Sequence, residues 1–343
     1  MSKHTTIAID LAKSSFAVVA LSSSGRELWC RTLRRKQLIA LLSRQEQSTV
    51  VMEACGSAHY WARCWSAMGH EVQLLPPQHV KGYLRGQKND YNDALAIAEA
   101  SLHGRVRQVR PKSVEQQDEQ AFHGIRQSLS REKVRLSNQL RGLLLEYGIA
   151  IAKGCATLKR EVPLILEEAE NGLTPRFRML LQRQYQRFLA LEAELAWYDD
   201  QLKQQVNQDE VCARLMEVPA VGPVVASAIK SWMGDGKQFR RGRDASAALG
   251  VVPRQHSTGG RQVLSGITKR GDTYLRSLII HGARAVVARV DGKTDPLSLW
   301  VQRVKATRGY NKAAVALANK LIRILWVIVA RGERYRPASI VTA

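Results

Sequence analysis

The sequence predicts a mixed α/β domain at the N-terminus, followed by a region that is almost entirely helical. From Thr5 to about Leu75, short apolar segments with strand character alternate with turns. From about Val114 onward, apolar residues instead recur every three or four positions, the spacing of amphipathic helices. The last part is rich in small residues and keeps helical spacing. We therefore divide the 343 residues into segments 1–112, 113–210 and 211–343.

The first segment is predicted to begin with a three-stranded meander. Strands and helices then alternate, and Pro76-Pro77 closes the last strand. Three strands followed by helix, strand, helix and strand is the order of an RNase H-like fold. The expected strands are 7–10, 16–21, one from 27, 49–53 and 72–75, and the expected helices are 35–44, one from 58, and 89–103.

Four acidic residues stand where a two-metal nuclease of the RNase H type needs them. Asp10 and Glu53 end apolar strands, whereas Asp90 and Asp93 lie one turn apart on one face of a helix. Such carboxylates are costly to desolvate and repel one another unless a cation balances them. Two Mg²⁺ ions about 4 Å apart would do so and would promote phosphodiester chemistry. The alternative is that strand-end acids are common and that aspartates at a helix start are caps.

The middle segment is predicted to form long helices with a heptad-like apolar seam. A break between them is expected at Gly172-Leu-Thr-Pro-Arg. Such a seam suits an antiparallel or intermolecular coiled coil, and an ordinary helical bundle is equally compatible. The seam consists of Phe122, Ile125, Leu129, Leu136, Leu140, Leu143 and Tyr147 on one helix, and of Phe188, Leu191, Leu195, Tyr198 and Leu202 on the other.

The last segment opens with Val218-Pro-Ala-Val-Gly-Pro-Val-Val-Ala-Ser-Ala-Ile, the shape of a helix-hairpin-helix element. In such an element a glycine turn directs backbone N–H groups of the next helix toward a phosphate. A plain helix-turn-helix packing unit is the alternative.

A second candidate site surrounds Ser257 and Thr258, which precede two glycines in a flexible loop. Residues 240–284 carry nine Lys or Arg against two acids. A serine hydroxyl among guanidinium groups can attack a phosphodiester, with His256 as a possible base. The alternative is a phosphate-binding loop in which the serine only donates a hydrogen bond. The cations we expect to bind nucleic acid are Arg254, Arg261, Lys269, Arg270 and Arg276.

Composition favours a cytoplasmic protein that binds nucleic acid. The net charge is +22, from 52 Lys and Arg against 30 Asp and Glu, and this excess spans the whole chain. We expect no membrane association, because no apolar run reaches 18 residues. The N-terminus shows no signal-peptide core. We expect the odd, scattered cysteines to be reduced core residues: Cys30, Cys55, Cys64, Cys155 and Cys212.

Two motifs in this order, separated by a helical insert, resemble the insertion-sequence 110 family of transposases. The resemblance is to its 1111 group in particular, to which the Piv DNA invertases are related. The segments around Asp10, Glu53 and Asp90–Asp93 are similar to the DEDD tetrad of its RuvC-like domain. The stretch from Gly250 to Gly260, with Ile267–Arg276, resembles the serine motif of its C-terminal transposase domain. The resemblance covers nearly the whole chain.

The resemblance implies a DNA recombinase that inserts and excises a mobile element. In that family a serine acts as nucleophile beside the metal-bound tetrad, and a noncoding bridge RNA selects donor and target DNA. Many relatives carry Ser immediately before the first glycine, where this chain has Thr258. We expect Ser257 to be the nucleophile, because its primary hydroxyl is less hindered. A homodimer or homotetramer is expected, because each strand exchange needs two active sites.

Two rival functions remain open from the sequence. The first is a metal-only junction nuclease related to RuvC, in which Ser257 only binds phosphate. The second is a non-catalytic architectural protein that binds nucleic acid and uses its acids structurally. A covalent protein–DNA adduct would distinguish the recombinase from the nuclease, and loss of cleavage in EDTA would exclude the architectural protein.

Overall fold

The computed structural model describes residues 5–87, 89–104 and 106–337. The N-terminal segment in which no signal peptide was found lies mostly outside them. The chain forms two compact units, Met1–Glu115 and Gln116–Ala343, and each is described by itself.

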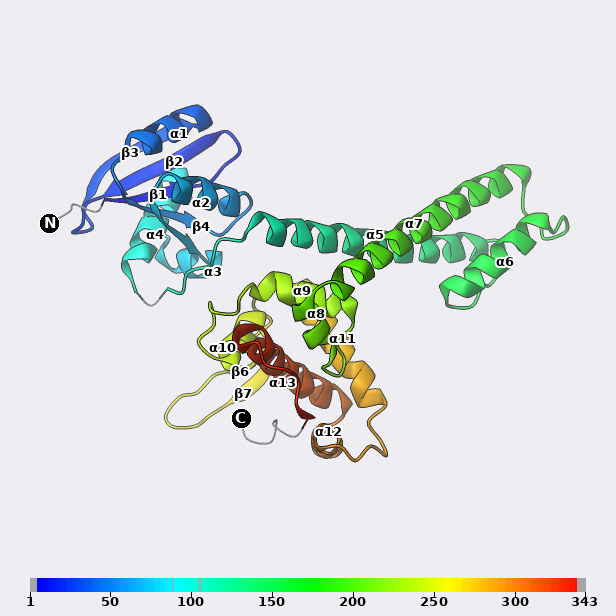
Figure 1. The fold of residues 1–343 in the computed structure, drawn as a ribbon. Helices are drawn as coiled ribbons and strands as arrows, with labels where there is room; N and C mark the ends of the chain where they lie inside the picture. The colour runs from blue at the N-terminus through cyan, green and yellow to red at the C-terminus, as the bar shows by residue number, and fades with distance from the viewer. Residues whose placement is uncertain (1–4, 88, 105, 338–343) are drawn as a thin grey trace. The chain divides into compact units, whose positions relative to one another are not determined.

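The first unit is built on a five-stranded mixed sheet in the order β3-β2-β1-β4-β5 (Figure 1). The meander pairs β1 with β2 and β2 with β3 antiparallel, whereas β4 runs parallel to both β1 and β5. The predicted order of strands and helices is confirmed, and the third strand is longer than its first apolar residues indicate. The strands are β1 (Thr6–Asp10), β2 (Ser15–Leu21), β3 (Glu27–Arg34), β4 (Thr49–Glu53) and β5 (Glu71–Leu75).

Helices cover both faces of this sheet. On one face, α1 (Arg35–Arg44) and α2 (Ala58–Ala67) bury apolar side chains that include Trp61 and Trp65, whose rings stack 4.9 Å apart. On the other face, α4 (Asp90–Leu102) packs its alanine-rich side against β1 and β2. Small residues on α4 let the helix approach the sheet closely, which brings the start of α4 near the ends of the strands. Two short elements connect β5 to α4, namely α3 (Pro77–Val80) and η1 (Lys81–Tyr83).

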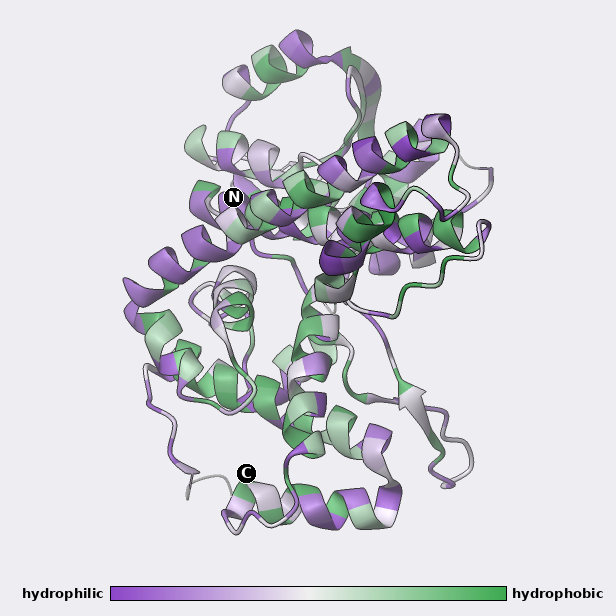
Figure 2. Cartoon of the chain, turned by 90° about the vertical axis from the view of Figure 1, so that its right-hand side faces the viewer, coloured by the Kyte–Doolittle hydropathy of each residue, from purple (hydrophilic) through white to green (hydrophobic). Residues whose placement is uncertain are grey.

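The second unit begins with a pair of long helices, α5 (Val114–Leu145) and α7 (Pro175–Asn207). They run antiparallel within the chain, as the ion pairs Arg126–Asp199 and Glu132–Arg187 show. In Figure 2 the long helices carry both green apolar and purple hydrophilic residues, as amphipathic helices do. A third helix, α6 (Cys155–Glu167), packs against this pair and was not predicted.

The predicted seam is correct only in part. Leu136, Leu140 and Phe188 are buried in the core of this region. Ile125, Leu143 and Tyr147 are exposed. The neighbouring Leu144 is buried in place of Leu143. Toward its C-terminal end, α5 shares an apolar cluster with α6, and its buried positions there step by four, from Leu136 to Leu140 and Leu144.

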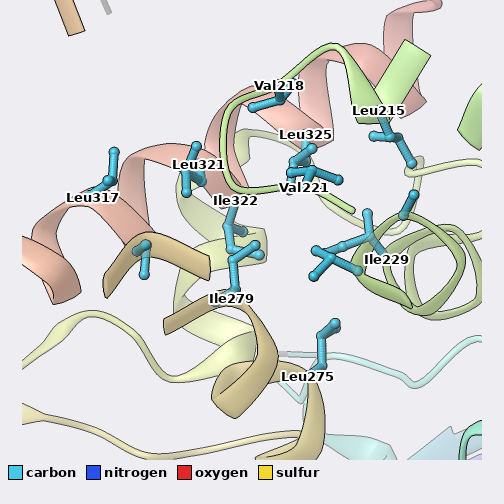
Figure 3. Close-up of a cluster of buried hydrophobic side chains, with 14 of the residues drawn as sticks. Leu215, Val218, Val221, Ile229, Leu275, Ile279, Leu317, Leu321, Ile322 and Leu325 are labelled. Carbon is cyan, nitrogen blue, oxygen red and sulfur yellow. The ribbon is translucent and has the colours of Figure 1, made fainter. Parts of the chain in front are cut away.

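The rest of the second unit is a helical bundle with its own core around α13 (Figure 3). In Figure 3, Leu317, Leu321 and Leu325 of α13 lie near apolar side chains of α8, α9 and α11. The helices are α8 (Glu210–Met216), α9 (Pro223–Met233), α10 (Gly242–Leu249), α11 (Thr273–Ala288), α12 (Pro296–Arg308) and α13 (Tyr310–Arg331).

One helix, α13, is long and apolar enough to cross a membrane by length and composition alone. This stretch is not a continuous apolar run in the sequence, because Lys320 and Arg323 interrupt it. Half of the apolar stretch is buried inside the second unit. Its apolar character follows from its place as the central helix of a protein core.

All five cysteines are free thiols. Only Cys212 is buried, and Cys64 and Cys155 are partly buried. The expectation that all are core residues is wrong for Cys30 and Cys55, which are exposed. Cys30 lies on β3, an edge strand of which most side chains face solvent.

Candidate active site

The first unit brings together three of the four predicted acids. Asp10, at the end of β1, meets Asp90 and Asp93 from the first turn of α4. One carboxylate oxygen from each lies within 4.8 Å of the other two. Asp90 is exposed, whereas Asp10 and Asp93 are partly buried. The three side chains therefore form a partly open acidic group where the carboxyl end of β1 meets the start of α4.

Glu53 lies outside this tight group of described residues. It follows Met52, which pairs with Ile9 of β1, so Glu53 and Asp10 end neighbouring parallel strands. Both belong to the alternation that directs Ala8 and Val51 toward α4. Glu53 is thus on the same face and edge of the sheet as the other acids, one strand further from α4.

Cys55 supports this placement of Glu53 beside Asp10. Although the residue as a whole is exposed, partial desolvation of its sulfur raises the pKa of the thiol first, and the carboxylates of Glu53 and Asp10 raise this pKa further. Both carboxylates therefore lie near the same sulfur. Hard cations such as Mg²⁺ prefer carboxylate oxygens to a thiol sulfur, so the acids and not Cys55 are the candidate ligands.

The aspartates of α4 are not the helix cap, so the alternative that they serve only as caps does not hold. The side chain of Asn89 is the cap, because its Oδ1 accepts a hydrogen bond from the backbone N–H of Asn92 at 2.8 Å. Asp90 and Asp93 follow in the first turn, where the helix dipole favours negative charge. Their carboxylates are therefore available to act together with Asp10.

The donor set fits a hard divalent cation. Mg²⁺ and similar ions bind oxygen ligands at about 2.1 Å, so opposite ligands of one ion lie about 4 Å apart. Oxygens within 4.8 Å of one another can reach that geometry through small side-chain rotations. Asp10, Asp90 and Asp93 can therefore hold one such ion.

The serine segment belongs to a β-hairpin in the second unit, and Ser257 and Thr258 lie in the loop between its two strands, as expected. Its strands are β6 (Pro253–Gln255) and β7 (Leu264–Ile267), which pair antiparallel. Between them, the backbone of His256 donates a hydrogen bond to the carbonyl of Val263 at 2.9 Å. This hydrogen bond extends the pairing of the two strands by one residue beyond β6, toward the tip of the hairpin.

Ser257 and Thr258 are both exposed but differ in their surroundings. The Oγ of Ser257 accepts a hydrogen bond from Nε2 of Gln255 at 2.9 Å, which leaves the hydroxyl proton available for donation. Thr258 exchanges backbone hydrogen bonds with Arg261 across a tight turn. The two central glycines have φ of 55° and 77°, as a type I′ turn requires.

The base of the hairpin is fixed by a close approach of backbones. A Cβ on Gly250, whose φ is 76°, would lie 2.3 Å from the backbone of Arg270. A Cβ on Gly271 would lie 2.0 Å from the carbonyl oxygen of Ala248. The end of α10 and the segment after β7 can therefore meet only where side chains are absent.

Arg276 is a correction to the predicted nucleic-acid-binding residues. It is only 8% exposed, and its guanidinium donates to the carbonyls of Leu249 and Arg270 and to Oγ1 of Thr273. The side chain therefore clamps the hairpin base from within. The other four predicted cations are exposed around the hairpin, namely Arg254, Arg261, Lys269 and Arg270.

The segment predicted as a helix-hairpin-helix element forms α8, a short turn and α9, an arrangement that a plain helix-turn-helix packing unit shares. Ala220 in the turn has φ of 75°, and its carbonyl packs against Gly282 of α11, where a Cβ would lie 2.5 Å away. Gly222 is exposed before Pro223, the first residue of α9. Contact of this turn with DNA stays a prediction.

The sequence analysis missed the partner of Ser257 and a set of basic residues on α12 and α13. Gln255 lies two residues before Ser257, and the alternation of a strand would have placed both on one face. On α13, Lys320 and Arg323 interrupt a largely apolar stretch, and this interruption could have indicated that one face of the helix lines a groove.

Two models of transposase families match this chain, one in each half. A transposase model of the IS110 DEDD type matches residues 7–149. The model for the transposase IS116/IS110/IS902 family matches residues 212–297. The first match contains all four predicted acids, and the second contains the serine hairpin.

Relatives from several bacteria are similar to this chain over nearly their full length. The transposase for insertion sequence element IS1111A of Coxiella burnetii is 43% identical over 96% of this chain and 91% of its own. A probable family 20 transposase of Pseudomonas aeruginosa is 44% identical over 96% of this chain and 98% of its own. The transposase for insertion sequence element IS1328 of Yersinia enterocolitica is 38% identical over 97% of this chain and 98% of its own. This chain therefore belongs to the IS110 family of transposases and is a DNA transposase.

Proposed function

We propose that this transposase cuts and rejoins DNA with Mg²⁺ held by Asp10, Asp90 and Asp93, with Glu53 as a fourth ligand. The observation that carries the proposal is the convergence of three carboxylates from distant parts of the chain to within 4.8 Å. When bound, the metal polarises the scissile phosphate and stabilises charge on the leaving oxygen. Asp10, Asp90 and Asp93 would hold the cation through their carboxylate oxygens, and the exposed position of Asp90 would leave the ion open to a substrate phosphate.

The first unit is inferred to be an RNase H-like domain of the RuvC type. Its strand order, with an antiparallel meander on one side of β1 and parallel strands on the other, supports this. The acids lie at the carboxyl ends of β1 and β4 and at the start of α4. In open α/β sheets, this edge of the parallel strands is where ligands commonly bind.

Ser257 is proposed as the nucleophile. Its Oγ would form a bond to phosphorus as the bond to the DNA 3′ oxygen breaks, and the hydroxyl proton would pass to that leaving oxygen. Its exposed position and its bond from Gln255 support the role, since the oxygen is oriented and accessible. Arg254 and Arg261 are placed on the same hairpin to neutralise the charge that develops on the phosphate.

Donor and target DNA and a noncoding bridge RNA are the proposed partners. The net charge of +22 supports binding of long polyanions. We propose a homodimer or homotetramer, because strand exchange needs two active sites. We place the protein in the bacterial cytoplasm, where it meets the nucleoid.

A metal-only nuclease is the second candidate, and one observation favours it. The acidic group is assembled by the first unit alone, so metal-dependent hydrolysis would need nothing from Ser257. In that case the hairpin would only bind phosphate.

Trapping the protein–DNA adduct distinguishes the two. We expect Ser257→Ala to abolish both the adduct and recombination, because no neighbouring oxygen replaces one that must be placed in line with phosphorus. Thr258→Ala should only reduce rates. The linked peptide is mapped by mass spectrometry. A link on Thr258 would move the nucleophile by one position, and cleavage without any link in Ser257→Ala would support the nuclease.

A further inference from the structure

A large groove in the second unit is lined by β7, α12, α13 and the segment that follows α13. Its volume is about 1410 Å³, above the range of about 300–1,000 Å³ typical of small-molecule sites. β7 is one strand of the hairpin that carries Ser257, so the groove begins at the base of that hairpin. Its size and place point to a polymeric ligand near the serine.

The groove is strongly basic. Nine Lys and Arg side chains line it, against a single carboxylate, Glu333. Gly242 brings α10 against α13, because a Cβ there would lie 3.1 Å from the backbone of Arg323. This close approach gathers Arg241, Arg243 and Arg323 at one wall. Such like charges repel one another, and a bound polyanion would relieve that repulsion.

The lowered pKa of Lys320 is consistent with the excess of positive charge in the groove. Burial lowers the pKa of its ammonium, and the neighbouring Arg323 lowers it further. The ammonium lies 4.8 Å from the ring centre of Trp300, in a cation–π contact. A cation and an aromatic ring therefore stand side by side on the groove wall.

The groove also has an apolar lining, which plain phosphate binding does not need. Trp300 is only partly buried, and it lines the groove together with small aliphatic side chains of α13. Duplex DNA keeps its base faces stacked inside the helix and offers a protein mainly phosphates and base edges. An unpaired strand exposes base faces, which stack on aromatic side chains while cations follow the backbone.

We propose that this groove binds an unpaired strand of DNA, with a base on Trp300 and phosphates on Arg308, Lys312 and Arg323. The strand would run beside β7 and so past the base of the serine hairpin. The assignment to DNA rests on the transposase's substrate, and the assignment to an unpaired strand rests on the apolar lining. It gives the enzyme a place to hold a strand opened next to the cut.

The test measures binding of the full chain to labelled oligothymidine in EDTA, where strand cleavage is absent. Binding can then fail or succeed regardless of whether the metal and serine chemistry is correct. Arg308→Gln combined with Lys312→Gln should weaken binding and lower the slope of log affinity against log salt by about 1.4, since each phosphate contact on a single strand contributes about 0.7. Arg303→Gln is the control, because Arg303 is exposed on α12, the helix that carries Arg308, but does not line the groove.

Stacking is tested separately from charge. Trp300→Leu should weaken oligothymidine binding about 5- to 150-fold, the effect of losing one base stack, without changing the salt slope. Trp300→Phe keeps a ring and should restore most of the affinity, which also shows that the loss is not misfolding. Photocrosslinking with 5-iododeoxyuridine should label the peptide that contains Trp300.

Four results would overturn the proposal. The first is unchanged affinity in the Arg308 and Lys312 double variant. The second is an equal loss of duplex binding in Trp300→Leu, which would contradict the unpaired strand. The third is a loss confined to oligouridine, which would make the groove an RNA site. A crosslink that maps only outside the groove-lining segments would overturn it as well.

Discussion

Arg276→Met removes the clamp at the base of the serine hairpin, and the structure sets its expected effect. The guanidinium donates at 3.1 Å to the carbonyl of Leu249, which is fully buried, and at 2.8 Å to that of Arg270. A buried acceptor left without a donor costs about 1–3 kcal/mol. The bond to exposed Thr273 adds little, because water can replace it.

The expected loss is therefore about 2–4 kcal/mol, taking the Leu249 carbonyl in full and the Arg270 carbonyl in part. Methionine fills similar volume, so the loss reflects hydrogen bonds more than a cavity. Opening of the hairpin base would become about 30- to 1,000-fold more frequent, since 1.4 kcal/mol is tenfold. A typical domain has about 5–15 kcal/mol in total, so the unit should still fold.

Hydrogen exchange at the backbone amides of Thr268 and Lys269 measures this opening directly. These amides donate to the carbonyls of Val252 and Gly250 and close the hairpin base. Arg270→Met is the matched control: it removes the same charge from an exposed side chain and should leave exchange unchanged while weakening DNA binding. Less than about a threefold change in Arg276→Met would refute the clamp.

Three further predictions concern stability and binding. Burial and the neighbouring Lys112 lower the pKa of His59 from 6.5 to about 4, so only the unfolded state gains a proton as pH falls through this window. The free energy of unfolding of the first unit should therefore fall by about 1–2 kcal/mol between pH 6.5 and pH 4, a figure reduced because His59 is partly exposed. In His59→Gln, urea unfolding should show a weaker dependence of this free energy on pH. Gly250→Ala should unfold the hairpin base, whereas Gly148→Ala, with φ of 75° but no atom within 4 Å of its Cβ, should cost only backbone strain in thermal melts. Arg254→Ala should lower the salt slope of duplex binding by about one, and an unchanged slope would remove it from the interface.

The order of elements in the first unit was predictable because its signals are local. Apolar runs such as Ile7–Asp10 and Thr49–Glu53 are bounded by turn residues, and both end at the predicted acids. What the sequence could not settle was distance. Asp10, Asp90 and Asp93 form the tight group, while Glu53 lies outside it, because side-chain reach depends on how closely α4 packs on the sheet.

The second unit was less predictable, because its packing partners are distant in sequence. Periodicity cannot separate a helix with two neighbours from one with three, so Leu143 was placed in a seam whose buried residue there is Leu144. Charge alone could not separate surface from interior, so Arg276 was grouped with exposed cations. Its carbonyl acceptors belong to the end of α10 and the hairpin base, which only the fold brings together.

The central claim is that the acidic group of the first unit carries the metal on which DNA cleavage depends. Cleavage of element-end DNA by Asp10→Asn, measured across a Mg²⁺ titration, tests it most directly. We expect no cleavage at any ordinary Mg²⁺ concentration, with DNA affinity in EDTA equal to that of the unchanged protein, because the substitution removes one ligand charge and adds no bulk. Full cleavage by Asp10→Asn at ordinary Mg²⁺ would contradict the claim.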